Sequence, residues 1–372
     1  MTANKTQRLQ SLDVMRGLTV AMMILVNNQY GESFAPLQHA KWNGMTPCDL
    51  VFPFFLFIMG ISTYLSLMKT GFKPTAPVIR KIVKRTVLLF LIGLGIHWFD
   101  MALDGHATDL AHLRIWAVLQ RIALCYLAVS VFALTVSHRH LIKTIVGLLV
   151  LYALILIFGN GYDYDASTNI LARVDLRLFG AGHLYHKSPV DPEGLLGTIP
   201  SVAHTLIGFY CARKMMQAKD IQAKVLGFLL TGGILVICGY LLSFGLPLNK
   251  RIWSPSYVLV TCGLAALLQG IIMYAMDYPK AQPKKSSSFG NLQPSFTTFF
   301  QVFGVNPLFL YVMSELLAII FGHVGISNAV FTGICHIIST PQIQSLTYAL
   351  LFTAFHFVIG WPLYKRHIYI KL

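Results

Sequence analysis

Long apolar blocks recur along the whole chain and are separated by shorter polar segments. An α-helix needs roughly 20 predominantly apolar residues to cross the ~30 Å hydrocarbon core of a bilayer. The pattern therefore predicts an all-α fold, a polytopic integral membrane bundle of about ten transmembrane helices. The predicted spans are 12–31, 50–69, 82–99, 115–136, 142–158, 195–213, 224–244, 256–276, 300–321 and 345–364. The apolar stretch at 324–340 is shorter, and we expect it to be interfacial or re-entrant.

Basic residues gather in alternate loops, at 69–85, 137–143, 213–224 and 277–299. Since Lys and Arg mark cytoplasmic loops, we predict a multi-pass protein of the cell (inner) membrane with both termini in the cytoplasm. The long loops 32–49 and 159–194 then lie on the outer side, and we expect both to be ordered. Segment 280–295 has the composition of a flexible cytoplasmic linker. We predict one transmembrane domain over residues 1–372.

Composition narrows the class of protein. The chain is 55% hydrophobic and only 12% charged, whereas soluble domains carry about 25% charged residues. The net charge of +15 follows from the basic loops, so we expect membrane lipid, not nucleic acid, as a partner. The six cysteines have no C-x-x-C spacing, so we expect no disulfide framework, no zinc site and no metal. P-loop, serine-hydrolase and zinc-protease motifs are absent from the sequence.

The first apolar block carries a stripe of polar residues. Steps of 100° per residue place Arg16 and Asn27 within about 60° of Asp13 around the helix. The spacing of Asp13 and Arg16 favours a structural i,i+3 ion pair over a functional role. Asn27 lies near the outer end of the stripe, where its amide is suited to hydrogen-bond a ligand.

The outer loop before the second span contains His39, Trp42, Asn43 and Asp49 close together. A histidine with a nearby carboxylate is the minimum equipment for general acid–base catalysis. The alternative is a structural histidine, and spacing alone does not decide between the two. We expect Asp49 to cap or lead the helix that follows.

The fourth span opens with Arg114, Gln120 and Arg121. The two arginines are two turns apart on one helix face, and Arg121 lies roughly 10 Å into the membrane. A guanidinium at that depth either pairs with a buried carboxylate or holds an anionic ligand. Both alternatives stay open.

Several later spans begin with polar residues, and helix N-termini bind anions. The sixth span is preceded by Glu193 and opens with Thr198 and Ser201. The remaining candidates of this kind precede the eighth span or lie in the ninth: Lys250, Trp253, Ser254 and Asn306.

Four motifs near the start resemble the heparan-α-glucosaminide N-acetyltransferase family, multispan acyltransferases with a lysosomal member and many bacterial relatives. They are Ser11-Leu-Asp13-Val-Met-Arg16-Gly17, Val26-Asn27, His39-Ala-Lys-Trp42-Asn43-Gly44 and Asp49-Leu-Val-Phe52-Pro53-Phe54. Later stretches resemble the family too: Val118-Leu-Gln120-Arg121, Asp191-Pro-Glu193-Gly194 and Asn249-Lys250-Arg251-Ile-Trp253-Ser254. The resemblance covers nearly the whole chain.

The resemblance implies transfer of an acetyl group from cytosolic acetyl-CoA to an amine of a glucosamine-type sugar or glycan on the outer side. His39 is then the base or the nucleophile, Asp49 orients its ring, and Asn27 donates to the thioester oxygen. The CoA phosphates need cations, either Arg114 and Arg121 or Lys84 and Arg85. The expected substrate- and CoA-binding residues are Asp13, Arg16, Trp42, Asn43, Arg114, Gln120, Arg121, Glu193, Thr198, Ser201, Lys250, Trp253, Ser254 and Asn306.

Two rival functions remain at this point. A transporter of an anionic solute explains Arg114 and Arg121 equally well but does not need a His–Asp pair. A non-catalytic scaffold predicts that the polar residues form closed structural pairs. The acceptor and the oligomeric state, including a homodimer, are left open.

Overall fold

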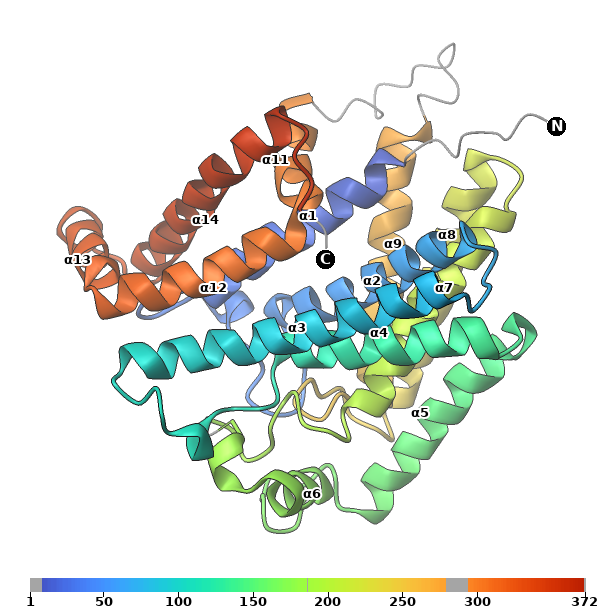
Figure 1. The fold of residues 1–372 in the computed structure, drawn as a ribbon, viewed down its shortest axis with the longest axis horizontal. Coiled ribbons are helices and arrows are strands. Elements are labelled where there is room, and N and C mark those ends of the chain that lie inside the picture. The colour runs from blue at the N-terminus through green and yellow to red at the C-terminus, as the bar shows by residue number, and fades with distance from the viewer. Residues whose placement is uncertain (1–8, 186, 279–293, 371–372) are drawn as a thin grey trace.

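The computed structural model describes residues 9–185, 187–278 and 294–370. All regular elements in these ranges are helices, and the only β-type pairing in them is an isolated bridge between Gly44 and Asn249. The predicted all-α class is therefore confirmed. Figure 1 shows the arrangement of the helices.

The helices have the following bounds: α1 (Gln10–Asn27), α2 (Val51–Met68), α3 (Ala76–Leu103), α4 (Val118–Thr135), α5 (Leu141–Phe158), α6 (Ile170–Phe179), α7 (Thr198–Gln217), α8 (Ile221–Ser243), α9 (Pro255–Met276), α11 (Pro294–Val305), α12 (Pro307–His323), α13 (Ile326–Ile337) and α14 (Pro341–Lys365). Short 3-10 helices lie between them: η1 (Ala35–Leu37), η2 (Pro47–Leu50), η3 (Leu110–His112), η4 (His138–His140) and η5 (Ala181–His183).

A helix lies at each of the ten predicted spans, but the count of ten transmembrane helices is not confirmed. In the described residues, seven helices are long and apolar enough to cross a membrane, and a bent pair raises the number to eight. The helices α1 and α7 are not among them. Both carry polar residues such as Arg16 and His204, and most of their residues are covered by neighbouring helices. A helix enclosed by protein does not need an apolar surface on every side.

The predicted span at 300–321 is not one straight helix, because α11 and α12 meet at an angle of 82°. The break falls at Asn306, whose φ and ψ of −127° and 57° are not helical. Pro307 follows it, and a proline disfavours helical geometry in the preceding residue. The Asn306 side chain then bonds the C-terminal segment: it donates to Ile368 O and accepts from Ile370 N, both at 2.8 Å. This predicted substrate-binding residue therefore has structural contacts.

The short apolar stretch at 324–340 forms α13, a helix of 12 residues. At 1.5 Å per residue it is about 18 Å long, too short to cross the hydrocarbon core. Its interfacial or re-entrant placement stays a prediction. The predicted linker at 280–295 lies almost wholly outside the described residues.

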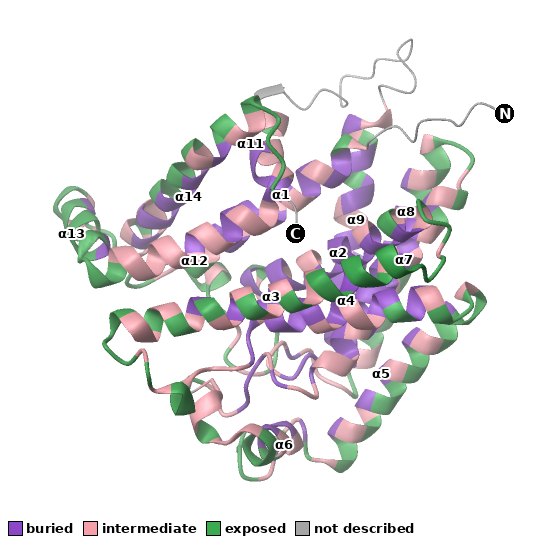
Figure 2. Ribbon diagram, in the orientation of Figure 1, coloured by how far each residue is buried: buried purple, intermediate pink, exposed green. Residues whose placement is uncertain are grey.

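The helices α2, α4, α7 and α9 are the most buried of the bundle (Figure 2). Glycines allow α2 and α7 to approach closely, since a Cβ at Gly60 would lie 2.0 Å from Thr205 O and one at Gly208 would lie 2.1 Å from Phe57 O. Small residues at such crossings are typical of membrane helices. Because α2 carries the outer loop with His39 at its start, this packing positions the candidate site.

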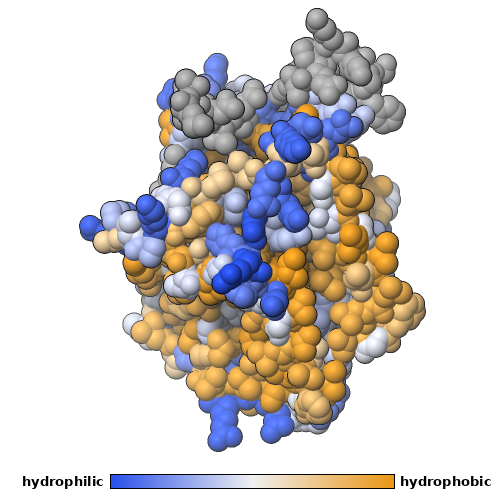
Figure 3. All heavy atoms as spheres, turned by 90° about the vertical axis from the view of Figure 1, so that its right-hand side faces the viewer, coloured by the Kyte–Doolittle hydropathy of each residue, from blue (hydrophilic) through white to orange (hydrophobic). Residues whose placement is uncertain are grey.

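The outer faces of α5 and α8 expose large apolar side chains, including Ile157, Ile234 and Leu241. On the side of the molecule seen in Figure 3, hydrophobic residues cover a broad zone, with hydrophilic residues gathered above it and at its lower edge. An exposed apolar surface of this extent is what a lipid-facing surface requires. With the apolar spans, it makes this a multi-pass membrane protein.

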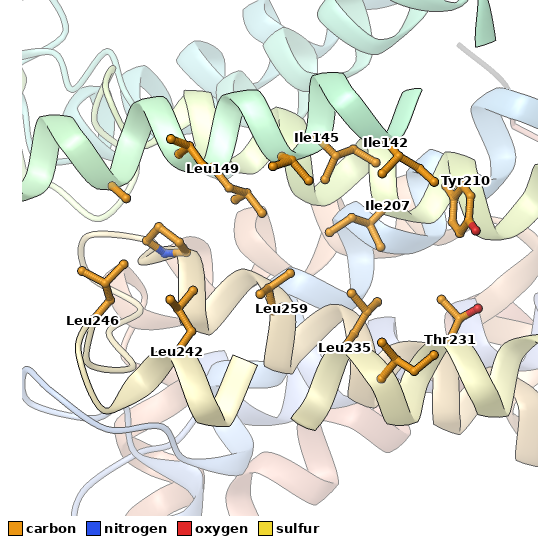
Figure 4. Close-up of a pocket in the computed structure, with 15 residues that line it drawn as sticks. Ile142, Ile145, Leu149, Ile207, Tyr210, Thr231, Leu235, Leu242, Leu246 and Leu259 are labelled. Atoms are coloured by element: carbon orange, nitrogen blue, oxygen red, sulfur yellow. The ribbon is translucent and has the colours of Figure 1, made fainter. Parts of the chain in front are cut away.

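An apolar cavity of about 490 Å³ lies between α5, α7, α8 and α9. Figure 4 shows its lining, in which Leu149, Leu235 and Leu259 point into the space. Tyr210 and Thr231 supply its polar atoms. No ionisable acid, base or thiol nucleophile that could perform acyl transfer lines it, so the candidate chemistry lies elsewhere.

Candidate active site

The 3-10 helix η2 leads into α2 and positions Asp49. Thr46 and Asp49 form a capping box, in which Thr46 N donates to Asp49 Oδ2 at 3.0 Å. Ala40 N donates to the same oxygen at 3.1 Å. The Asp49 side chain is fully buried, and its predicted capping role is confirmed.

The other carboxylate oxygen of Asp49 orients His39. Asp49 Oδ1 lies 2.7 Å from His39 Nδ1, and the histidine side chain is 42% exposed. With a proton on Nδ1 donated to the carboxylate, the lone pair of Nε2 is available to a substrate. Cys48, which the sequence analysis did not single out, also lies here, with Sγ 3.2 Å from Nδ1.

Lys250 reaches the same site from the loop before α9. Its Nζ lies 3.3 Å from His39 Nε2, 2.9 Å from Nδ1 and 3.4 Å from Asp49 Oδ1. The Asp49 carboxylate is an acceptor for this ammonium, which leaves the Nε2 lone pair for a substrate. The structure therefore brings a cation to the His–Asp pair across 211 residues of sequence.

The loop that carries Lys250 is held against the His39 loop. Gly44 N donates to Leu248 O at 2.7 Å, and Asn249 Nδ2 donates to Asn43 Oδ1 at 3.1 Å. Gly44 has φ +110°, a conformation that only glycine adopts readily. Asn43 thus supports the site by binding the second loop, and sequence reasoning missed the part of Asn249 in this contact.

Three further contacts build the walls of the site. Ser254 caps α9, because its Oγ accepts from Tyr257 N at 3.4 Å. The Tyr257 hydroxyl donates to the backbone oxygen of Asp49 at 2.5 Å. Trp42 Nε1 donates to Tyr162 O at 3.0 Å and so connects the two long outer loops. Ser254 and Trp42, both predicted to bind substrate, therefore have structural contacts.

Arg121 is fully buried, and neither predicted alternative describes its contacts. Its two terminal nitrogens donate to Pro192 O and Gly194 O, each at 2.7 Å. Its guanidinium also lies over the Trp253 ring, 5.4 Å from the centroid. The guanidinium holds the loop before α7 instead of pairing with a carboxylate.

Arg114 is paired with two carboxylates, Asp191 at 3.1 Å and Glu193 at 2.8 Å. It also lies over the Tyr185 ring at 4.6 Å. The predicted binding residues Arg114 and Glu193 are therefore paired with each other in an ion pair. The charge of Arg114 is therefore balanced by carboxylates, whereas Arg121 binds backbone carbonyls only.

Asp175 lies on α6, a helix that the sequence analysis did not predict, and packs under the same loop. Its Oδ1 accepts from Leu195 N at 3.0 Å, while Oδ2 is buried without a partner in the described residues. Burial raises the pKa of Asp175 to about 6, although the bond from Leu195 N opposes this shift. No sequence motif distinguishes it from the other acids of the 159–194 loop.

The remaining candidates on α1 and α7 lie within the bundle. Asp13 and Arg16 form the predicted i,i+3 ion pair at 3.1 Å, and Arg16 also donates to Ser62 Oγ at 3.2 Å. Ser201 donates to a backbone carbonyl of its own helix. The Thr198 hydroxyl is buried without a partner among the described residues.

A second polar cluster surrounds Asn27. Its Nδ2 donates to Glu315 Oε1 at 3.3 Å, across 288 residues of sequence. Both residues line a cavity of about 140 Å³ together with Gln120, Arg114 and His97. His39 does not line this cavity, so the structure does not bring Asn27 into contact with His39. Sequence reasoning missed Glu315 and His97, whose signal was a single ionisable residue inside a long apolar run.

Asp100, Asp104 and His323 form an exposed group at the ends of α3 and α12, and their ligand atoms lie within 4.8 Å of one another. Exposed acidic groups of this kind are common without a bound ion. That the protein uses no metal stays a prediction.

A sequence model of the family described as "Heparan-alpha-glucosaminide N-acetyltransferase, catalytic" matches residues 8–228. The chain belongs to this family. Heparan-alpha-glucosaminide N-acetyltransferase of Homo sapiens is 29% identical over 327 residues, which cover 73% of this chain and 49% of the relative. The Mus musculus enzyme is 28% identical over 328 residues, with the same shares covered. The chain spans about half the length of the curated relatives it matches.

The family match includes His39, Asp49 and Arg121 but ends before Lys250 and Glu315. The match therefore covers the outer loop and the centre of the bundle. The cation at the His–Asp pair comes from the loop before α9, and the acid at the second cavity comes from α12, both beyond the match.

Proposed function

We propose that this protein transfers an acetyl group from acetyl-CoA to an amine of a glucosamine-type sugar or glycan on the outer side of the membrane. The 2.7 Å contact between His39 and the buried Asp49 carries the proposal. A ring held in this way by a carboxylate presents Nε2 in a defined direction, as acyl transfer requires.

Two routes use the same geometry. As a base, His39 Nε2 accepts a proton from the amine while the amine nitrogen attacks the thioester carbon, and the C–S bond breaks to release CoA thiolate. As a nucleophile, Nε2 attacks the thioester carbon itself, CoA thiolate leaves, and the amine then takes the acetyl group from the imidazole. Lys250, 3.3 Å from Nε2, is placed to donate to the oxygen that gains negative charge in either route.

The phosphates of the donor need cations that are not already paired. Arg114 and Arg121 are engaged by carboxylates and backbone carbonyls. Arg80, Lys81 and Lys84 instead line an open pocket of about 640 Å³ at the start of α3, with no ion pair among the described residues. This supports the basic cytoplasmic face, one of the two predicted alternatives, as the site for the CoA phosphates.

The test is acetyl transfer from radiolabelled acetyl-CoA to glucosamine by the purified protein in detergent. His39→Ala should abolish transfer, whereas the control His112→Ala changes an exposed histidine that also pairs with an aspartate and should leave transfer intact. Transfer that survives in His39→Ala would move catalysis away from this residue. Exchange of radiolabelled CoA into acetyl-CoA without acceptor separates the two routes, since only the nucleophilic route forms an acetyl-enzyme that returns its acetyl group to CoA.

A further inference from the structure

The apolar cavity between α5, α7, α8 and α9 opens onto the lipid-facing surface of the bundle. Figure 4 shows α5 on one side of it and α8 on the other. Val150 and Ile234 line it from these two helices, and they are 52% and 61% exposed. Because an exposed apolar surface of a membrane helix faces lipid instead of water, lipid acyl chains have direct access to the cavity.

The length and the volume of the cavity fit an acyl chain. The lining extends from Ile142 to Ala153 on α5 and from Thr231 to Leu242 on α8. At 1.5 Å per residue each stretch is about 16 Å long, which is roughly half of the ~30 Å hydrocarbon core and so the depth of one leaflet. The volume of about 490 Å³ lies within the range of ~300–1,000 Å³ typical of ligand pockets. The cavity therefore suits the chain of a lipid from one leaflet.

Two lysines lie beside the polar atoms of this lining. The Lys214 ammonium lies over the ring of Tyr210, 5.8 Å from the centroid, and Tyr210 lines the cavity. Thr231 lines both the cavity and a neighbouring pocket of about 20 Å³, whose lining includes Lys214 and Lys224. Within the described residues neither lysine forms an ion pair, and the nearby Asp220 instead caps α8 by accepting from a backbone N–H of its first turn at 2.7 Å. The apolar cavity is therefore continuous with a positively charged pocket.

The charge of this pocket indicates the headgroup of the lipid. Both lysines belong to segment 213–224, which contains four basic residues and one acid and which the sequence predicts to be cytoplasmic. Anionic phospholipids give the cytoplasmic leaflet its negative surface potential, and lysines near that surface attract them. A phosphate carried on apolar chains thus matches both parts of the site.

We propose that the cavity and its basic pocket bind a phospholipid with an anionic headgroup. Its acyl chain lies between α5 and α8, and its phosphate is bound by Lys214 and Lys224. This site is separate from His39, and the proposal does not rest on the proposed acetyltransferase function.

The test titrates the delipidated full chain with phosphatidylglycerol or phosphatidylcholine of identical acyl chains and counts bound lipid by native mass spectrometry. Wild-type protein should bind phosphatidylglycerol more tightly. The double variant Lys214→Gln and Lys224→Gln should weaken phosphatidylglycerol binding by about 5-fold per lysine and leave phosphatidylcholine binding unchanged. The control Lys219→Gln alters an exposed lysine of the same segment that lines neither pocket, and it should keep the wild-type preference.

A second variant tests the acyl-chain contacts without changing any charge. Val150→Trp places a larger side chain at the cavity and should weaken the binding of both lipids to a similar extent. The control Ile157→Trp adds the same side chain to an exposed position of α5 outside the lining, and it should leave both affinities unchanged. Both positions are more than half exposed, so the larger side chain does not have to fit into a closed core.

Four outcomes would overturn the proposal. Wild-type protein could bind the two lipids equally, or the lysine double variant could keep its affinity for phosphatidylglycerol. Lipid binding that is unchanged in Val150→Trp would place the acyl chain outside this cavity. A wild-type dimer that becomes a monomer in Val150→Trp without loss of lipid would assign the cavity to a second copy of the chain. Inorganic phosphate that competes with phosphatidylglycerol at equal affinity would show that the acyl chain contributes nothing.

Discussion

The carboxylate of Asp49 is completely buried, yet its Oδ1 lies 2.7 Å from Nδ1 of a His39 side chain that is 42% exposed. One end of the pair is fixed by backbone donors inside the protein, and the other end is open to a substrate. Catalytic histidines need this combination, because the ring must be held without being covered.

We expect Asp49→Asn to lower the rate of acetyl transfer by about 10²- to 10⁴-fold. The asparagine can turn its amide nitrogen towards Nδ1, which favours the tautomer with the proton on Nε2 and removes the lone pair from the substrate side. The measurement is kcat with saturating acetyl-CoA. Asp109→Asn is the control, because Asp109 pairs with His112 at the same 2.7 Å distance on the exposed surface. Equal rates for Asp49→Asn and wild type would contradict the orienting role.

If the basic pocket at the start of α3 binds the CoA phosphates, substitutions there should weaken acetyl-CoA binding and leave the rate of the chemical step unchanged. The double variant Arg80→Gln and Lys84→Gln should raise KM for acetyl-CoA by up to about 5-fold per lost charge, the upper end of the range for exposed ionic contacts. The KM for glucosamine and kcat should stay unchanged. Lys143→Gln, in another basic loop, is the control. An unchanged KM for acetyl-CoA would place the phosphates elsewhere.

Arg121→Met should destabilise the protein by about 2–5 kcal/mol. It leaves two buried backbone carbonyls, Pro192 O and Gly194 O, without their donors, and each bond from a charged donor contributes roughly 1.5–3 kcal/mol. Thermal unfolding in detergent measures the change. Exposed Arg139→Met should unfold at the wild-type temperature. A fully stable Arg121→Met that fails only to bind acetyl-CoA would instead support the predicted ligand role.

The raised pKa of the Asp175 carboxyl makes the stability of the folded protein depend on pH. Burial raises its pKa from 3.8 to about 6, so between these values the unfolded chain is ionised while the folded protein keeps the proton. The folded state then binds more protons, and its stability falls as the pH rises from about 4 to 6. Asp175→Asn should flatten this part of the profile and raise stability above pH 6 by about 1–3 kcal/mol. Melting temperatures across pH 4–8 test this, and an identical slope in both proteins would contradict it.

Close packing of α2 on α7 predicts that Gly60→Ala disrupts the bundle. The new Cβ would lie 2.0 Å from the backbone oxygen of Thr205, and backbone cannot move aside as a flexible side chain does. We expect a loss of at least 1–3 kcal/mol. Gly147→Ala is the matched control, since nothing lies within 4 Å of its Cβ position, and it should be neutral or stabilising by up to about 1 kcal/mol. Equal melting temperatures for the two variants would contradict the packing argument.

The sequence by itself determined the helical class, the positions of the apolar blocks and the His39–Asp49 pair. Hydrophobic blocks show directly in the sequence, because every residue of a membrane helix must suit the lipid or a neighbouring helix. The pair spans only ten residues, within one loop and one helix start, so its local motif was sufficient to predict it. The structural pair of Asp13 and Arg16 was predictable for the same reason.

Only the tertiary structure decided which distant side chains meet. Lys250 joins His39 across 211 residues and Glu315 joins Asn27 across 288, and no local pattern encodes such distances. Arg121 was recognised as too deep for lipid, but its partners are backbone carbonyls, and these carry no side-chain signal in the sequence. The break at Asn306 could not be predicted from the apolar run around it. Hydropathy indicates whether a segment lies in an apolar environment, but it does not indicate where the helix axis changes direction.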